Sequence, residues 1–175
     1  MSPTPTKIEI RQARPDDAAA CIRHVHRISE EFPENVTCAP GEFDVTVEQE
    51  QKLLADAAAS DNALFLLALA DDDVVGLLNY SGGKRRSLRH AVTLGVSVRK
   101  AWCDRGVGTA LLNAAIAHAR ATGVVRRIEL QVYNHNERAI HVYRKLGFTE
   151  EGRRRHAAFK NGRYYDDLVM ALLFD

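Results

Sequence analysis

One block of the chain, residues 89–133, constrains the possible folds more than any other. Residues 91–98 form an apolar run of strand length, residues 106–122 carry a helical repeat that stops at Gly123, and residues 128–133 form a second apolar run. A strand, a glycine-containing turn, a helix and a strand in this order are typical of a parallel βαβ unit with a right-handed crossover. The sequence therefore predicts an α/β fold in which two strands of the sheet run parallel.

The segments on either side of this block predict further strands and helices. Strands are expected over residues 7–13, 63–70, 74–80, 148–152 and 164–174, with a hairpin turn at Asn161-Gly162. Helices are expected over residues 15–29 and 46–60, and from a cap at Asn134 to Gly147. Residues 30–44 show neither a helical nor a strand repeat of apolar residues, which predicts a long loop. Loops of this length in compact domains often border a site. No repeat or linker interrupts residues 1–175, so a single domain with a mixed sheet is expected.

The composition excludes several classes of protein. The 175 residues carry 24 Lys and Arg against 23 Asp and Glu, a net charge of +1 that does not suggest a nucleic-acid partner. No apolar stretch approaches the ~18–20 residues of a membrane span, and residues 1–6 do not resemble a secretory signal, so a cytoplasmic location is expected. Cys21, Cys38 and Cys103 have no paired spacing, which predicts reduced thiols and no metal site.

The turn that enters the helix of residues 106–122 carries the first functional signal. Its glycines, Gly106 and Gly108, let the backbone approach a ligand, and the start of a helix directs unpaired N–H groups and a positive dipole toward an anion such as phosphate. The turn lacks the third glycine of a dinucleotide fingerprint and the Gly-Lys-Ser/Thr ending of a P-loop. A tight turn with close helix packing would need the same glycines, so both interpretations stay open on this evidence alone.

A second motif follows the second parallel strand and has the form Asn136-x-x-Ala139-x-x-x-Tyr143-x-Lys145-Leu146-Gly147-Phe148. Together with Leu94-Gly95-Val96-x-Val98 and the glycine turn, it resembles the GNAT superfamily of acetyl-CoA-dependent N-acetyltransferases, closely over residues 90–148 and more loosely over the whole chain. The resemblance implies a single-domain α/β fold with a mixed, mostly antiparallel sheet, a central βαβ unit and helices on both faces. It also implies an acceptor side in residues 1–88, an acetyl-CoA-binding core in residues 89–150 and closing strands in residues 151–175.

The resemblance implies a role for each matched residue. The strand of Val96, Ser97 and Val98 would pair with the pantetheine arm of acetyl-CoA, Asn136 would contact this arm, and Tyr143 would lie beside the sulfur as a general acid. The pyrophosphate would be held by Arg105, Gly106, Val107, Gly108, Thr109 and Ala110. Asn136 and Tyr143 are two helical turns apart and can therefore face one cleft. Cys103 stands where the family usually has Gln or Arg, which predicts weaker side-chain support for the pyrophosphate.

The general base and the acceptor pocket are less defined. The strand of residues 89–98 has no Asp or Glu, where many relatives carry a carboxylate. A base that acts through water is the default expectation, and the side-chain candidates are Glu30, Glu31, His90 and Glu129, each of which also suits a structural role.

The C-terminal pattern Gly162-x-Tyr164-x-Asp166-x-x-x-Met170 is similar to the endings of bacterial family members that acetylate amino acids and other small amines. Tyr164 and Asp166 would border the acceptor pocket or form the polar face of the last strand.

The working hypothesis is an enzyme that moves an acetyl group from acetyl-CoA to the primary amine of a small molecule, such as an amino acid, by direct attack in a ternary complex. A protein N-terminus or lysine is the alternative acceptor, and a non-catalytic acyl-CoA-binding module is the alternative class. The resemblance also implies a homodimer formed through the C-terminal strands. No metal, nucleic acid or membrane partner is expected.

Overall fold

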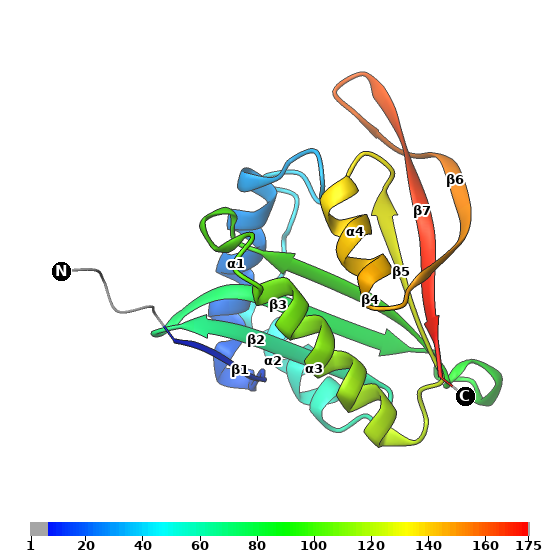
Figure 1. Ribbon diagram of the computed structural model, residues 1–175. Helices are drawn as coiled ribbons and strands as arrows, with labels where there is room; N and C mark the ends of the chain where they lie inside the picture. The colour runs from blue at the N-terminus through cyan, green and yellow to red at the C-terminus, as the bar shows by residue number, and fades with distance from the viewer. Residues whose placement is uncertain (1–6, 175) are drawn as a thin grey trace.

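Seven strands form one sheet in the order β1-β2-β3-β4-β5-β7-β6 in the computed structural model, which describes residues 7–174 (Figure 1). They are β1 (Ile8–Gln12), β2 (Ala63–Ala70), β3 (Asp73–Gly82), β4 (Ala91–Val98), β5 (Arg127–Tyr133), β6 (Thr149–Lys160) and β7 (Arg163–Leu173). Every neighbouring pair is antiparallel except β4 and β5, which are parallel as the βαβ pattern predicts. Residues 1–6, where a secretory signal was not expected, lie outside the described residues.

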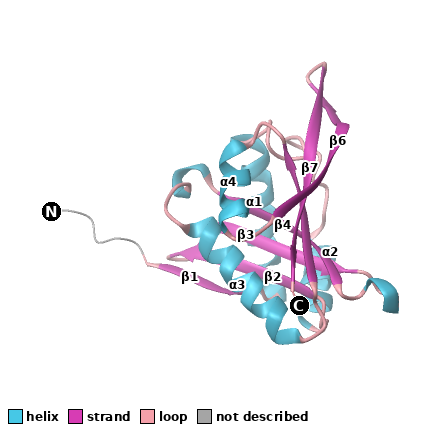
Figure 2. Ribbon diagram, turned by 45° about the vertical axis from the view of Figure 1, so that its right-hand side comes forward, coloured by secondary structure: helices cyan, strands magenta, loops and turns pink. Residues whose placement is uncertain are grey.

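Four α-helices cover the two faces of this sheet: α1 (Ala18–Glu31) and α2 (Val47–Ala58) on one face, and α3 (Val107–Thr122) and α4 (Glu137–Lys145) on the other (Figures 1 and 2). Short 3₁₀ turns occupy Pro15–Asp17, Arg86–Leu88 and Lys100–Trp102. Strand β2 shows why both faces are covered, because Leu64 and Leu66 belong to the core under α3 while Phe65 and Leu67 belong to the core under α1 and α2. The predicted mixed, mostly antiparallel α/β fold is therefore confirmed.

Local signals place most element ends correctly. At the start of α2, Gln49 N donates to Thr46 Oγ1 at 3.2 Å and Thr46 N donates to Gln49 Oε1 at 2.9 Å, which is the predicted capping box. Gly123 ends α3 in the left-handed conformation, with φ of +67°. The Asn161-Gly162 hairpin joins β6 to β7 as predicted.

Three local predictions are wrong. The cap of α4 is Asn136, whose Oδ1 accepts a hydrogen bond from Ala139 N at 3.2 Å, because the amide of Asn134 still donates to Asp166 O of β7. Strand β6 continues to Lys160 instead of ending at residue 152, since its polar residues pair along β7 while remaining exposed. Helix α1 continues to Glu31, so Glu30 and Glu31 belong to its last turn and not to the following loop.

The parallel strands β4 and β5 pair over only three positions, from Ala91 opposite Arg127 to Thr93 opposite Glu129. Beyond Thr93, β4 remains paired with β3 on one edge, while β5 turns away with β7 (Figure 1). The outer edge of the last residues of β4 therefore has backbone N–H and C=O groups without a strand partner. This opening in the sheet positions the candidate site.

Candidate active site

A cavity of about 180 Å³ lies where β4 and β5 diverge. Its walls come from the end of α1 and the loop after it, the end of β4, the start of α3, and α4. The lining residues are Ile28, Phe32, Asn35, Val36, Val96, Ser97, Val98, Cys103, Gly108, Leu112, Asn136, Arg138, Ala139, Val142 and Tyr143. The predicted site residues from β4 and α4 thus meet Gly108 in one cavity, and the remaining predicted residues from Arg105 to Ala110 form the adjoining turn and first turn of α3.

Side chains at the end of β4 alternate between the two faces of the sheet. Val96 and Val98 pack against the core under α3 and α4, whereas Ser97 points to α1, where its hydroxyl contacts His24. All three residues line the cavity. The opening therefore connects the α3 and α4 face of the sheet with the α1 face.

Different structural features account for the presence of glycine at the two positions at the start of α3. Gly106 caps the helix with φ of +79°, a left-handed conformation that favours glycine. Gly108 has no such constraint, and a Cβ added there would meet only Val98 Cγ2 at 3.6 Å, an ordinary contact. Helix packing therefore does not require glycine at position 108. Its missing side chain instead leaves room in the cavity wall.

The start of α3 presents free amides and cationic side chains. The first backbone hydrogen bond of the helix runs from Ala110 N to Gly106 O at 2.9 Å, so the amides before it have no intrahelical acceptor. The guanidinium of Arg105 lies 5.1 Å from the centre of the Trp102 ring. Arg138 of α4 lines the cavity and pairs with Asp104 at 3.0 Å. This combination suits a phosphate group.

Tyr143 of α4 lies against the same cavity and is 8% exposed. Burial raises the pKa of its phenol to about 12, so the hydroxyl keeps its proton at neutral pH. Its ring packs on Phe148 with the ring centres 5.9 Å apart, and within residues 7–174 no hydrogen bond engages its hydroxyl. A protonated phenol without a partner, facing a cavity, is able to donate a proton to a leaving group.

The carbonyl oxygen and the amide nitrogen of the Asn136 side chain have different roles. Its carbonyl oxygen caps α4 through Ala139 N, as described above. Its amide nitrogen donates to no group in the described part of the chain, and Asn136 lines the cavity. The amide N–H groups are therefore the part of this side chain that is available to a ligand.

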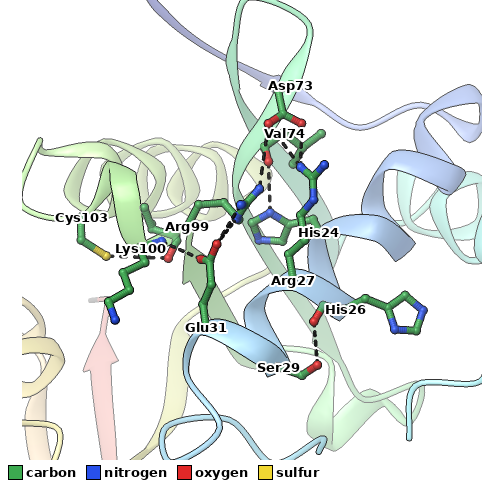
Figure 3. Close-up of polar contacts among 11 residues, drawn as sticks. His24, His26, Arg27, Ser29, Glu31, Asp73, Val74, Arg99, Lys100 and Cys103 are labelled. Carbon is green, nitrogen blue, oxygen red and sulfur yellow. Dashed lines mark hydrogen bonds and ion pairs between the residues drawn. The ribbon is translucent and has the colours of Figure 1, made fainter. Parts of the chain in front are cut away.

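Glu31 is the last residue of α1, and its carboxylate is hydrogen-bonded to the segment that follows β4 (Figure 3). Its carboxylate accepts hydrogen bonds from Arg99 Nε at 2.8 Å and from Lys100 N at 2.7 Å. Burial raises the pKa of Glu31, but the hydrogen bonds from Lys100 and Arg99 outweigh it and leave the pKa below its ordinary value. Glu31 therefore fastens the end of α1 beside the cavity and is poorly suited to take a proton.

The other candidate bases also lie outside the cavity lining. Glu30 and His90 are exposed, and Glu129 pairs with Arg127 at 2.8 Å. Among the described residues, no Asp or Glu lines the cavity. A base acting through water agrees with this arrangement.

Tyr164 and Asp166 line a second depression, of about 540 Å³, together with Glu34, Asn134, His135, Arg153, Arg163 and Tyr165. Hydrogen bonds from His156 N at 2.8 Å and from the Arg153 side chain lower the pKa of Asp166. Tyr164 is 60% exposed. The structure therefore does not bring these two predicted acceptor residues into the cavity of Tyr143.

The loop after α1 contributes residues to the lining of both depressions and is tied to the strands. His135 Nε2 and Asn35 Oδ1 are 3.0 Å apart, the hydroxyl of Tyr165 donates to Glu34, and Lys160 Nζ donates to Pro33 O at 3.2 Å. These contacts hold the part of the loop that lines the cavity. The loop thus forms a fixed wall.

A family model described as the acetyltransferase (GNAT) family matches residues 25–148, which include β4, α3, β5 and α4. The chain belongs to the GNAT family. It is an N-acetyltransferase of that family, and the resemblance expected from the Asn136 to Phe148 motif is confirmed.

Relatives of this GNAT chain cover nearly its whole length. It is 36% identical to the L-amino acid N-acetyltransferase AaaT of Escherichia coli strain K12 over 166 residues, which cover 95% of this chain and 98% of that relative. A solved GNAT acetyltransferase from Streptococcus pneumoniae has a TM-score of 0.93 at 31% identity, covering 97% of this chain and 100% of the other. A putative acetyltransferase from Salmonella typhimurium, solved with acetyl-CoA, shares the fold with a TM-score of 0.84 at 21% identity, covering 97% and 95%.

A residue that does not line the cavity but contacts one that does was not identified from the sequence. His24 of α1 is 1% exposed, its Nε2 lies 2.9 Å from Ser97 Oγ, and its Nδ1 lies 3.3 Å from Val74 O. Burial lowers the pKa of His24 to about 4. The available signal was its place on the buried face of α1, three residues after Cys21 and four before Ile28.

In residues 7–174, no helix combines the length and the apolar character that crossing a membrane requires. The same residues contain no group of three or more His, Cys, Asp or Glu side chains arranged to hold a metal ion.

Proposed function

We propose that this GNAT enzyme transfers the acetyl group of acetyl-CoA to the primary amine of an amino acid or a similar small molecule, by direct attack in a ternary complex. The observation that carries the proposal is the Tyr143 hydroxyl, protonated and without a hydrogen-bond partner in the described part of the chain, on the cavity where β4 and β5 diverge. The 36% identity to an L-amino acid N-acetyltransferase over nearly the whole chain supports the class of acceptor.

The residues at the opening fit acetyl-CoA. The free edge of β4 at Val96, Ser97 and Val98 offers backbone groups to the amides of the pantetheine arm, as a neighbouring strand would. The amides that precede Ala110, from Arg105 to Thr109, suit the pyrophosphate, and the Asn136 amide suits the arm. The space left by Gly108 is a cradle that a Cβ would fill.

The reaction needs little from the protein beyond orientation and one proton donor. The amine lone pair forms the new C–N bond at the thioester carbonyl, and the C–S bond breaks. Tyr143 donates its proton to the departing sulfur, and an N–H group of the β4 edge stabilises the carbonyl oxygen. The surplus proton on nitrogen passes to water.

A small acceptor is favoured over a protein because the loop after α1 closes one side of the cavity. Phe32, Asn35 and Val36 of this loop line the cavity, and the contacts of Lys160 and His135 hold the loop in place. A protein N-terminus or a lysine on a folded surface would need an open groove here.

The test is acetyl-CoA-dependent thiol release with L-amino acids, spermidine and peptides as acceptors. We expect turnover with one or more small amines and a much slower rate in Tyr143→Phe. Faster turnover of peptides than of every small amine would contradict the acceptor class. If acetyl-CoA binds tightly but no acceptor releases thiol, the protein is an acyl-CoA-binding module instead.

A homodimer, a cytoplasmic location and the division into residues 1–88, 89–150 and 151–175 remain predictions. Strand β6 is exposed along most of its length at the edge of the sheet, which supports a dimer contact through the C-terminal strands. Light scattering should give twice the mass of one chain, and the mass of a single chain would contradict the dimer.

A further inference from the structure

His24 and Ser97 form a hydrogen-bonded pair that no step of the proposed reaction uses. The imidazole of His24 is buried between α1 and the sheet, and its two nitrogens contact Ser97 Oγ at 2.9 Å and Val74 O at 3.3 Å. Figure 3 shows the ring with its contact to Val74. Ser97 lines the same cavity as Tyr143.

The contacts define where the protons of this pair lie. A carbonyl oxygen only accepts, so Nδ1 of His24 carries the proton that Val74 O receives. The buried ring is neutral at pH 7 and therefore has no second N–H, which makes Nε2 an acceptor. The hydroxyl of Ser97 must then donate its proton to His24 Nε2.

The orientation of the Ser97 hydroxyl leaves its oxygen lone pairs for another donor. Within the described residues, no other group hydrogen-bonds to this oxygen. The charged groups near His24, which are Arg99, Glu31 and Asp73, are engaged with one another (Figure 3). Ser97 Oγ is thus a fixed hydrogen-bond acceptor at a cavity that carries no carboxylate in its lining.

We propose that Ser97 Oγ accepts a hydrogen bond from the amine nitrogen that attacks acetyl-CoA, and that His24 is the positioning residue that fixes the hydroxyl for this contact. The inference rests on the proposed function and assigns the place of the acceptor amine. Val96 and Val98 face the side of α3, where the pyrophosphate turn lies, whereas Ser97 faces α1. The amine therefore enters from the α1 face, opposite the cofactor.

The hydrogen bond to Ser97 is stronger in the transition state than before it. As the nitrogen lone pair forms the C–N bond, the nitrogen gains positive charge, so its N–H group becomes a charge-assisted donor. The sulfur takes the proton of Tyr143 as the C–S bond breaks, the surplus nitrogen proton passes to water, and the phenolate recovers a proton from water. Ser97 and His24 end the cycle with their own protons.

The pair also resembles a nucleophile and its base, in which His24 would receive a proton through Ser97. A buried imidazole with a pKa near 4 is a weak base at neutral pH, which favours the positioning role. The two roles differ in their effect on the pH profile, because only a proton acceptor adds its own ionisation to the profile.

The test compares kcat/KM for the best amine, the dissociation constant of acetyl-CoA and the pH profile across variants. We expect Ser97→Ala to lower kcat/KM about 10- to 100-fold, the loss for one hydrogen bond to a charged group, while acetyl-CoA binding is retained. His24→Leu should cause a similar loss, and His24→Gln, whose amide is able to accept from Ser97 and donate to Val74 O, should recover most of the activity. The matched controls Ser81→Ala and His26→Gln change exposed or part-exposed residues of β3 and α1 and should behave like wild type.

The decisive result is Ser97→Ala, which removes only one oxygen and does not depend on the packing of a variant at His24. Unchanged kcat/KM in Ser97→Ala, with an active wild type, would overturn the inference. A pH profile that loses an ionisation in His24→Gln would overturn the positioning role. A wild-type protein without turnover would refute the proposed function itself, which distinguishes the two failures.

Discussion

Alanine substitutions at Gly106 and Gly108 test two different reasons for glycine at these positions. One reason is a backbone conformation that favours glycine, and the other is the space left by the missing side chain. At Gly106 a Cβ would meet no atom within 4 Å, so the cost of alanine is that of the left-handed conformation alone, at φ of +79°. That cost is roughly 1–2 kcal/mol. At Gly108 the Cβ would make an ordinary contact with Val98, and the loss of unfolded-state freedom should stabilise the protein by about 0.4–1 kcal/mol.

The two variants should therefore change different properties: Gly106→Ala should change the thermal stability, and Gly108→Ala should change the affinity for acetyl-CoA. Gly106→Ala should lower the midpoint of thermal unfolding by about 2–8 °C, at 2–4 °C per kcal/mol for a chain of this size. Gly108→Ala should unfold at the wild-type temperature or above it, but should bind acetyl-CoA more weakly because its Cβ projects into the cavity wall. Circular dichroism on heating gives the first quantity and titration calorimetry with acetyl-CoA the second.

The wild-type protein and Gly108→Glu complete the series. The glutamate should abolish acetyl-CoA binding, because it places a negative charge where phosphate is expected. If Gly108→Ala and Gly108→Glu both bind acetyl-CoA at wild-type affinity, the start of α3 is not the cofactor site. If Gly106→Ala unfolds at the wild-type temperature, the left-handed cap does not contribute to stability.

Three further perturbations test the site chemistry and its supports. Tyr143→Phe should lower kcat about 10²- to 10⁴-fold with acetyl-CoA affinity retained, and a kcat near that of wild type in a thiol-release assay would remove Tyr143 from the mechanism. His24 has a folded-state pKa of about 4, below its ordinary 6.5, so the stability it contributes is present above pH 6.5 and is lost as the pH falls toward 4, by up to about 3 kcal/mol. Urea unfolding should show this loss in wild type but not in His24→Gln, and equal acid sensitivity would contradict the neutral ring. Glu31→Gln should lower the free energy of unfolding by about 1–3 kcal/mol, since its pair with Arg99 is only 22% and 20% exposed. Lys52→Ala, at the exposed Lys52–Asp56 pair, is the matched control and should change little; an equal loss in both would show that Glu31 is not a special support.

Features that depend on neighbours in the chain were predicted correctly from the sequence. The βαβ unit, the capping box of Thr46 and Gln49, the Gly123 cap and the Asn161-Gly162 hairpin arise from periodicity and from backbone preferences within a few residues. The motif from Asn136 to Tyr143 belongs to the same class, because two helical turns place both residues on one face of α4.

Features that depend on contacts between distant segments came only from the tertiary structure. The full length of β6 follows from its pairing with β7, and the divergence of β4 and β5 after Thr93 follows from the competing partners β3 and β7. Glu31 was a candidate base by residue type, but its contacts with Arg99 and Lys100, 68 and 69 residues away in sequence, make it a structural anchor.

The sequence by itself thus determined most of the elements, the family and the residues that we propose for the cofactor, while the tertiary structure decided which distant side chains meet at the candidate site. The clearest case is the pair of His24 and Ser97, which are 73 residues apart. The helical spacing of Cys21, His24 and Ile28 is a signal that could have placed His24 on a buried face, but only the packing of α1 against β4 shows which oxygen its imidazole meets. Local patterns specify which way a side chain points, and long-range packing decides what it contacts.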